Sequence, residues 1–265
     1  MCIRDSPYLF LDATYLDIRQ GGRVVSQAVV VATGVAATGH REVLGMAIGD
    51  AETTDFWTEF LRSLRERGLT ISTPAAPEGV LMVTSDAHSG LKHAIKAVLP
   101  GASWQRCRVH FARNITQTLG SARSKPVNAL VSTIFAQTSP ETVRDSFQQV
   151  TASLENSFPQ VAAMLKDAEA DLTAFAAFPI EHWRKIWSNN PIERVNREIK
   201  RRADVVQIFP NRDSATRLVG AVLQDQHEEW QYGERRYISD ISLRRLADIL
   251  TTDTPENNSR LLMTA

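Results

Sequence analysis

The sequence predicts an α/β fold in which a mixed five-stranded sheet is flanked by helices and interrupted by an all-helical insertion. Three apolar runs near the N-terminus are joined by short connections, which favours an antiparallel meander. Two further short apolar runs alternate with helical patterns, as in α/β proteins generally. From about Phe111 to Trp187 the apolar residues follow helical periodicity only, and this stretch is the predicted insertion.

The five strands are predicted from runs of β-branched and other apolar residues. Gly21-Gly22 lies between the first two runs and is a turn signal. Pro100-Gly101 separates the last strand from the helix before it. In chain order the predicted strands are residues 8–12, Arg23–Thr33, Val43–Ile48, Val80–Thr84 and Ala102–Arg108.

Helix boundaries are predicted from capping residues, glycine and proline. One helix starts at Thr53 or Thr54, which can cap it, and stops near Gly68. Ser124-Lys125-Pro126 and Ser139-Pro140-Glu141 open two insertion helices with proline at the first helical position. The other predicted helices are Ser89–Val98, Phe158–Phe178, one with Asn190 as its N-cap, and Ser214–Trp230, and the polar tail beyond Thr251 is expected to be loose.

Composition limits the class of protein. The chain has 265 residues, 43% of them hydrophobic, which is enough for a sizeable core. No apolar stretch approaches the ~18–20 residues that span a bilayer, and a soluble cytoplasmic protein is expected. Only Cys2 and Cys107 are cysteines, so a disulfide framework is excluded. The 30 basic and 30 acidic side chains balance, which argues weakly against a general nucleic-acid coat protein.

Three carboxylates occupy positions typical of metal-binding residues. Asp12 and Asp86 each close an apolar strand-like run, and Glu193 opens a helix. An unpaired buried carboxylate is costly, so Asp12 needs a partner. Taken singly, each has a structural alternative: a turn cap for Asp12, a loop residue before a helix for Asp86, and a capping-box glutamate at the third helical position for Glu193.

The combination favours metal-dependent phosphodiester chemistry. Mg²⁺ prefers hard oxygen ligands and needs few protein carboxylates when substrate phosphate completes its shell. Two ions ~3.5–4 Å apart can activate an attacking oxygen and stabilise the leaving one. Strand-end and helix-borne carboxylates far apart in sequence can meet at one such site.

Basic residues gather beside Glu193. Residues 194–202 hold five basic side chains and one acid, Glu198. Cations at this place would hold DNA phosphates without reading the base sequence. The alternative is a solvated helix surface with an ion pair between Glu193 and Arg197. The predicted DNA-binding residues are Arg194, Arg197, Lys200, Arg201 and Arg202, and Arg106, Arg108 and Arg113 form a smaller cluster.

Several stretches, in order over roughly residues 8–238, resemble the bacterial Mutator-type insertion-sequence transposases. They are Tyr-Leu-Phe-Leu-Asp-Ala-Thr-Tyr, Ser-Asp-Ala-His-Ser-Gly-Leu-Lys-His-Ala-Ile, Trp-Gln-Arg-Cys-Arg-Val-His-Phe-Ala-Arg-Asn, Asn-Pro-Ile-Glu-Arg-Val-Asn-Arg-Glu-Ile-Lys-Arg-Arg, Val-Val-Gln-Ile-Phe-Pro-Asn and Arg-Leu-Val-Gly-Ala. Ala203 and Gln207 depart from this pattern, which has Thr and Gly at their positions, and both changes leave the three carboxylates intact.

The resemblance implies a ribonuclease-H-like core with a DDE triad of Asp12, Asp86 and Glu193, which would be both the catalytic and the metal-binding residues. It implies two Mg²⁺ ions, for which Mn²⁺ can substitute. The expected partners are double-stranded DNA, at the element's terminal inverted repeats and at the target, and a second copy of the chain in a homodimer. The implied segments are residues 1–110 and 188–238 for the core, 111–187 for the insertion and 239–265 for the tail.

A Cys-x2-His signature of the family is matched by Cys107 and His110. Half of a zinc arrangement is present without a convincing second half, so we expect a structural or DNA-positioning role. Core packing is the alternative for Cys107. His88 could contact substrate or orient a water, or bond to backbone. Trp183 and Trp187 match the family pattern and could stack on a distorted base, although their spacing of four favours core packing.

The predicted function is therefore a DNA transposase catalytic domain that hydrolyses phosphodiesters and transfers strands at insertion-sequence ends. Family members carry an N-terminal DNA-recognition region, which does not fit before Asp12, and the opening residues resemble no part of the family. One alternative is a truncated, non-transposing DNA-binding or inhibitory partner of a full-length transposase. Another is a stand-alone ribonuclease-H-like nuclease.

Overall fold

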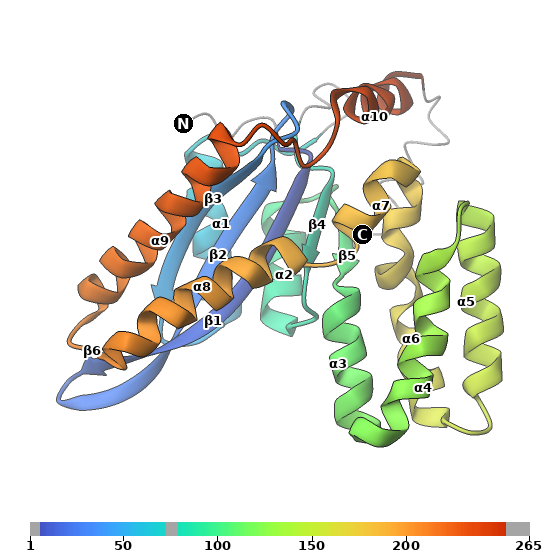
Figure 1. Cartoon of the computed structure of the whole chain (residues 1–265), viewed down its shortest axis with the longest axis horizontal. Helices are drawn as coiled ribbons and strands as arrows, with labels where there is room; N and C mark the ends of the chain where they lie inside the picture. Colours follow the sequence, from blue (N-terminus) through green and yellow to red (C-terminus); the bar gives the residue numbers. More distant parts are fainter. Residues whose placement is uncertain (1–5, 73–78, 253–265) are drawn as a thin grey trace.

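The computed structural model describes residues 6–72 and 79–252, and these form a mixed α/β structure (Figure 1). The main strand order is β3-β2-β1-β4-β5, and a sixth short strand, β6, pairs with β1. β1, β2 and β3 are antiparallel, whereas β4 and β5 continue parallel to β1. The strands are β1 Tyr8–Gln20, β2 Arg23–Val35, β3 Arg41–Gly49, β4 Met82–Ser85, β5 Ser103–Arg106 and β6 Ile208–Phe209.

The prediction of five strands was wrong, because the sheet of the described chain also contains β6. Only two residues long, this strand pairs Ile208 with Asp17 and Phe209 with Ile18. Two residues carry no readable alternation, so no sequence pattern predicts them. The mixed sheet flanked by helices is confirmed.

β1 is longer than the predicted run of residues 8–12, and Asp12 lies inside it rather than at its end. Beyond Asp12 the side chains alternate, with Thr14, Leu16 and Ile18 buried and Tyr15 exposed. This is the pattern of a strand with one covered face. A charged residue therefore interrupts the apolar run without ending the strand.

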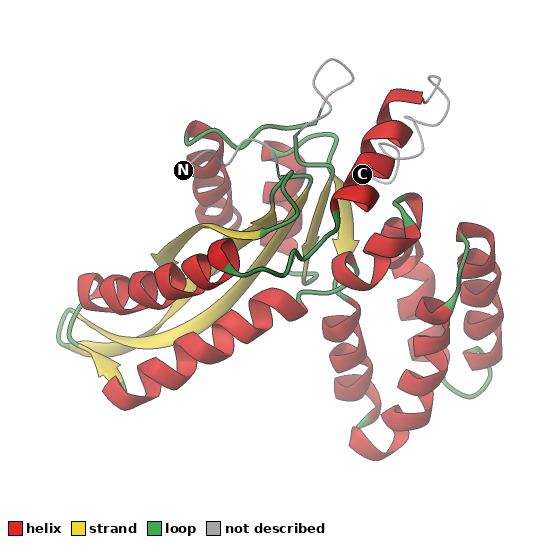
Figure 2. Cartoon of the chain, turned by 45° about the horizontal axis from the view of Figure 1, so that its top comes forward, coloured by secondary structure: helices red, strands yellow, loops and turns green. Residues whose placement is uncertain are grey.

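Helices cover both faces of the sheet (Figure 2). α1 (Thr54–Glu66) and α2 (Ser89–Val98) pack on one face around Trp57, which is completely buried. α8 (Asn190–Val206) and α9 (Arg212–Tyr232) run across the other face. The Ile192, Val195 and Ile199 side chains of α8 are fully buried there, because their helical spacing places them on one face of the helix. This packing fixes the orientation of α8 and therefore of Glu193.

Between β5 and α8 the described chain contains helices only, and they stand beside the sheet (Figure 1). The predicted Ser139 cap is confirmed for the helix that begins at Pro140, where Ser139 forms a capping box with Thr142. The predicted helix start at Pro126 was wrong, because that helix begins at Ser121 and contains Pro126. The predicted segment boundaries stay a prediction. The elements are α3 Arg108–Leu119, α4 Ser121–Ser132, η1 Thr133–Ala136, α5 Pro140–Leu154, α6 Pro159–Thr173, η2 Ala174–Ala177 and α7 Ile180–Ile186.

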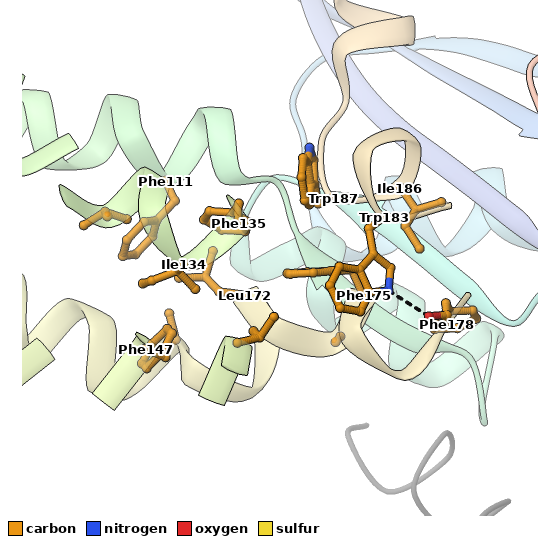
Figure 3. Packing of buried hydrophobic residues seen from close by; sticks show 14 of the residues in the cluster. Phe111, Ile134, Phe135, Phe147, Leu172, Phe175, Phe178, Trp183, Ile186 and Trp187 are labelled. Atoms are coloured by element: carbon orange, nitrogen blue, oxygen red, sulfur yellow. Dashed lines mark hydrogen bonds between the residues drawn. The ribbon is translucent and has the colours of Figure 1, made fainter. Parts of the chain in front are cut away.

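An aromatic cluster holds these helices together (Figure 3). Phe175 contacts Phe135, Trp183 and Trp187, with ring centroids 5.2–5.6 Å apart. Trp183 also donates a 2.7 Å hydrogen bond to the carbonyl of Phe178. Both tryptophans are nearly buried, which confirms core packing in place of base stacking. The same cluster includes Tyr8 of β1, so the insertion and the sheet share one core.

One more helix, α10 (Asp240–Thr252), follows α9 and was not predicted. The backbone N–H groups of Tyr237 and Ile238 bond to the carbonyl of Gly39, which ties this segment to the turn before β3. Cys2 and the tail beyond Thr252 lie outside the described residues. In the part of the chain that the structure describes, no helix has the length and apolar character needed to cross a membrane.

Candidate active site

Asp12 is a buried carboxylate on the face of β1 that α8 covers. Its side chain is 9% exposed. The Asn196 side chain, one turn after Glu193 on α8, donates a 2.9 Å hydrogen bond to Asp12 Oδ2. Burial is the main cause that raises the pKa of Asp12 to about 7, and the negative charges of Asp86 and Glu193 raise it further. Hydrogen bonds from Ala13 and Asn196 act in the opposite direction.

Asp86 follows directly after β4, at the end of the strand next to β1. Its Oδ1 atom accepts a 3.2 Å hydrogen bond from the backbone N–H of His88. That contact fixes the turn from β4 into α2, which begins at Ser89. His88 is the N-cap of α2 without a side-chain capping bond, and its buried Nδ1 atom has no partner among the described residues. His88 therefore positions Asp86 through its backbone.

Glu193 lies in the first turn of α8, but the capping box of the structural alternative is not formed. The N-cap is Asn189, one residue earlier than predicted, and it makes no side-chain capping bond. Glu193 points to α3 instead, where Arg113 lies 3.1 Å and His110 lies 3.8 Å from its Oε1 atom. The Arg113 contact has ion-pair distance without hydrogen-bond geometry, since Oε1 has no hydrogen-bond partner. Arg113 takes the place that the alternative interpretation gave to Arg197.

The structure brings the three predicted carboxylates into one electrostatic neighbourhood. Asp86 and Glu193 each act on the pKa of Asp12. They also act together on His110: burial lowers the pKa of this histidine, while both carboxylates raise it. Within residues 6–72 and 79–252, however, no group of three or more His, Cys, Asp or Glu side chains is arranged to hold a metal ion. The carboxylates are neighbours, but they do not form a closed ligand set.

Cys107 joins the elements that carry these residues. It is the completely buried N-cap of α3, and its N–H donates a 2.7 Å hydrogen bond to the carbonyl of Ser85 at the end of β4. Its Sγ atom accepts a 3.3 Å hydrogen bond from the N–H of Asn189, before α8. Asn189 in turn donates from its side chain to the carbonyl of Leu11 in β1. Burial raises the pKa of the Cys107 thiol, as expected for a positioning residue rather than a thiolate ligand.

The predicted DNA-binding residues lie along α8 and are all exposed. Glu198 bonds to Arg201 and Arg202, which lowers the pKa of its carboxyl to about 2. All of the predicted residues except Lys200 line a groove of 620 Å³, together with Glu198 and residues of α9. The predicted residues are Arg194, Arg197, Lys200, Arg201 and Arg202.

Sequence reasoning missed two further features at this site. Asn196 was not singled out, although it is three residues after Glu193 and therefore shares its helix face. Tyr15 donates a 2.7 Å hydrogen bond to Glu52, and Asp86 is close enough to contribute to its raised pKa of about 12, after burial and Glu52. The contact between Tyr15 and Glu52 spans 37 positions, so no local signal could have found it.

Comparison with known proteins matches this chain to transposases of insertion sequences. The family model "Transposase, Mutator family" matches residues 4–233. The chain is 46% identical over 251 residues to the transposase for insertion sequence element IS1081 of Mycobacterium tuberculosis, covering 94% of this chain and 59% of the relative. It is 37% identical over 238 residues to the transposase for element IS256 in transposon Tn4001 of Staphylococcus aureus, covering 89% and 59%. The chain thus spans about three fifths of the length of these relatives. It belongs to the Mutator family of transposases.

Proposed function

We propose that this chain is the catalytic region of a DNA transposase that cuts and joins phosphodiesters at insertion-sequence ends. The observation that carries the proposal is that Asp86 and Glu193 both act on the pKa of the buried Asp12, so that three carboxylates share one electrostatic neighbourhood. Burial is the main cause of the raised pKa of Asp12, and repulsion from the negative charges of Asp86 and Glu193 adds to it. A site that retains such repulsion is typical of a functional centre rather than of a structural ion pair.

The topology supports a ribonuclease-H-like core. Three antiparallel strands lead into two strands parallel to β1, and the order is β3-β2-β1-β4-β5. Asp12 lies in β1, and Asp86 follows β4, which pairs with β1 in parallel. Glu193 arrives from α8 after the insertion.

The donor set fits a hard divalent cation such as Mg²⁺ or Mn²⁺, because it consists of carboxylate oxygens. Asp12 and Asp86 would hold the ions, and Glu193 would join them on leaving Arg113. When bound, the ions supply activation of the attacking oxygen and stabilisation of the leaving one. Asn196 keeps Asp12 oriented, and the exposed basic residues of α8 bind the phosphates of double-stranded DNA. A pair of chains would hold the two ends of an element.

The test is Mg²⁺- or Mn²⁺-dependent nicking and strand transfer on DNA that carries element ends, comparing the wild type with Asp86→Asn. We expect activity in the wild type that EDTA abolishes and that Asp86→Asn lowers roughly 10²- to 10³-fold. Asp17→Asn is the matched control, because Asp17 is an exposed aspartate of β1. Equal activity in Asp86→Asn contradicts the proposal. DNA binding without cleavage in either protein supports the non-transposing partner instead.

Replacing Arg113 by alanine should tighten divalent-cation binding in the absence of DNA. The Arg113 guanidinium is a positive charge 3.1 Å from Glu193, so a metal ion must displace it. Its half-exposed side chain makes this a contact of about 1 kcal/mol, which corresponds to roughly a fivefold change in dissociation constant. Mn²⁺ binding measured by calorimetry or electron paramagnetic resonance checks the effect. Arg144→Ala, which removes an exposed arginine of α5, should leave it unchanged, and unaltered binding in Arg113→Ala would oppose the displacement.

A further inference from the structure

A second open cavity lies where the insertion meets the start of α8. Its volume is 740 Å³, within the range of ligand sites. α3, α4, η1, α7 and α8 contribute to its walls, and among the residues that the structure describes no aspartate or glutamate lines it. The residues that matter to the argument are Arg108, Phe135, Ile180, Arg184, Trp187 and Asn190.

Arg108 and Arg184 are two charged residues that line this cavity. Within residues 6–72 and 79–252, neither Arg108 nor Arg184 has an ion pair or a side-chain hydrogen bond. The Arg108 guanidinium lies over the Trp187 ring at 4.7 Å and over the Phe135 ring at 5.3 Å, so aromatic packing fixes its position. The N–H groups of this guanidinium have no hydrogen-bond acceptor among the described residues.

The positive charges of Arg108 and Arg184 are close enough to act on each other. Burial lowers the pKa of Arg108, the Cys107 thiol opposes that change, and the charge of Arg184 lowers it further. Two guanidinium groups that face one cavity without an acid repel each other, and an anion between them relieves the repulsion. Planar guanidinium forks match phosphate oxygens in particular.

The cavity adjoins the candidate active site along the backbone. Arg108 starts α3 two residues before His110, and Asn190 starts α8 three residues before Glu193. The two helix starts are joined by the hydrogen bond from Asn189 to Cys107 Sγ and by a 3.1 Å bond from Arg108 N–H to the carbonyl of Trp187. The cavity therefore lies beside the two helix starts that carry His110 and Glu193.

We propose that Arg108 and Arg184 bind backbone phosphates of the DNA strand next to the cleaved bond, so that the insertion holds the strand at the active site. The inference rests on the proposed function, since it assumes a DNA substrate. The contact is sequence-independent, because phosphates carry no base information. A free nucleotide offers the same phosphate chemistry, and the experiment separates the two sources.

The experiment measures binding of a short fluorescein-labelled DNA duplex to the full chain over a range of salt concentrations. Each phosphate contact contributes about 0.9 to the slope of log K against log salt. Replacing both arginines in Arg108→Gln/Arg184→Gln should reduce that slope by about two and weaken binding at low salt at least about tenfold. Arg184→Gln alone should reduce it by about one, and this exposed residue leaves the packing of Arg108 intact.

Arg62→Gln/Arg144→Gln is the matched control, because it removes the same charge from exposed sites on α1 and α5. Its slope should equal that of the wild type. An unchanged slope in both cavity variants overturns the inference while leaving DNA binding by α8 intact. A wild type that binds no DNA overturns both the inference and the proposed function. Loss of ATP binding in the variants with an unchanged DNA slope overturns it in favour of a free nucleotide.

Discussion

Replacing Asp12 by asparagine should stabilise the metal-free protein at and above neutral pH. Asp12 is 9% exposed and its pKa is raised from 3.8 to about 7, so ionisation in the folded state is costly. Ionising Asp12 therefore costs on the order of 4 kcal/mol more in the folded chain than in the unfolded chain, and this cost lowers the free energy of unfolding. Asparagine has nearly the same shape and keeps an oxygen for the hydrogen bond from Asn196.

The pH dependence follows from the direction of the shift. A carboxyl with a raised folded-state pKa stabilises the fold fully below its unfolded pKa, and this contribution is lost as pH rises through about 7. The wild type should therefore lose stability between about pH 4 and pH 7, relative to Asp12→Asn. Above pH 7 the difference should be constant.

Thermal unfolding in EDTA over this pH range measures the effect. Each kcal/mol shifts the melting temperature by roughly 2–4 °C in a chain of this size, so a difference of about 4 kcal/mol should raise the melting temperature of the variant by about 8–16 °C at pH 8. Mg²⁺ should stabilise the wild type and leave Asp12→Asn almost unchanged. Asp17→Asn, exposed on the same strand, should follow the wild type. Parallel pH profiles for Asp12→Asn and the wild type contradict the assignment of Asp12.

The sheet could be predicted from sequence because its strands carry continuous or alternating apolar residues. β2 and β3 were placed within two residues of their true ends. β1 was cut short at Asp12 because a charge was taken as an end, although the alternation of Leu16 and Ile18 with Tyr15 continues the strand. The start of α4 was placed too late because Pro126 was taken as the first helical residue. Proline can also lie inside a helix that neighbouring packing supports.

For the candidate site, sequence could nominate residues but could not supply their contacts. Asp12, Asp86 and Glu193 stood out through local context and the family resemblance. The ion pair of Glu193 with Arg113 depends on how α3 packs against α8, and it joins positions 80 residues apart. The bond from Asn189 to Cys107 spans 82 positions in the same way. Such contacts arise from tertiary packing, which no local pattern encodes.

Glu193→Gln should separate a catalytic carboxylate from a helix-terminal charge. Both roles place a negative group in the first turn of α8. If Glu193 only favours the helix terminus and pairs with Arg113, its loss costs about 1 kcal/mol of stability and leaves DNA cleavage intact. If it is a metal ligand, cleavage falls roughly 10²- to 10³-fold while stability changes equally little.

The measurement is single-turnover cleavage of pre-bound DNA, together with the melting temperature and the DNA dissociation constant of the same protein. Glu59→Gln is the matched control, because Glu59 is exposed on α1, on the opposite face of the sheet from α8. A fall in cleavage with unchanged DNA binding and only a small drop in melting temperature supports the catalytic role, since the lost interaction then acts in the reacting complex. Cleavage at the wild-type rate would leave Glu193 as a structural partner of Arg113, and the metal would then depend on Asp12 and Asp86 alone.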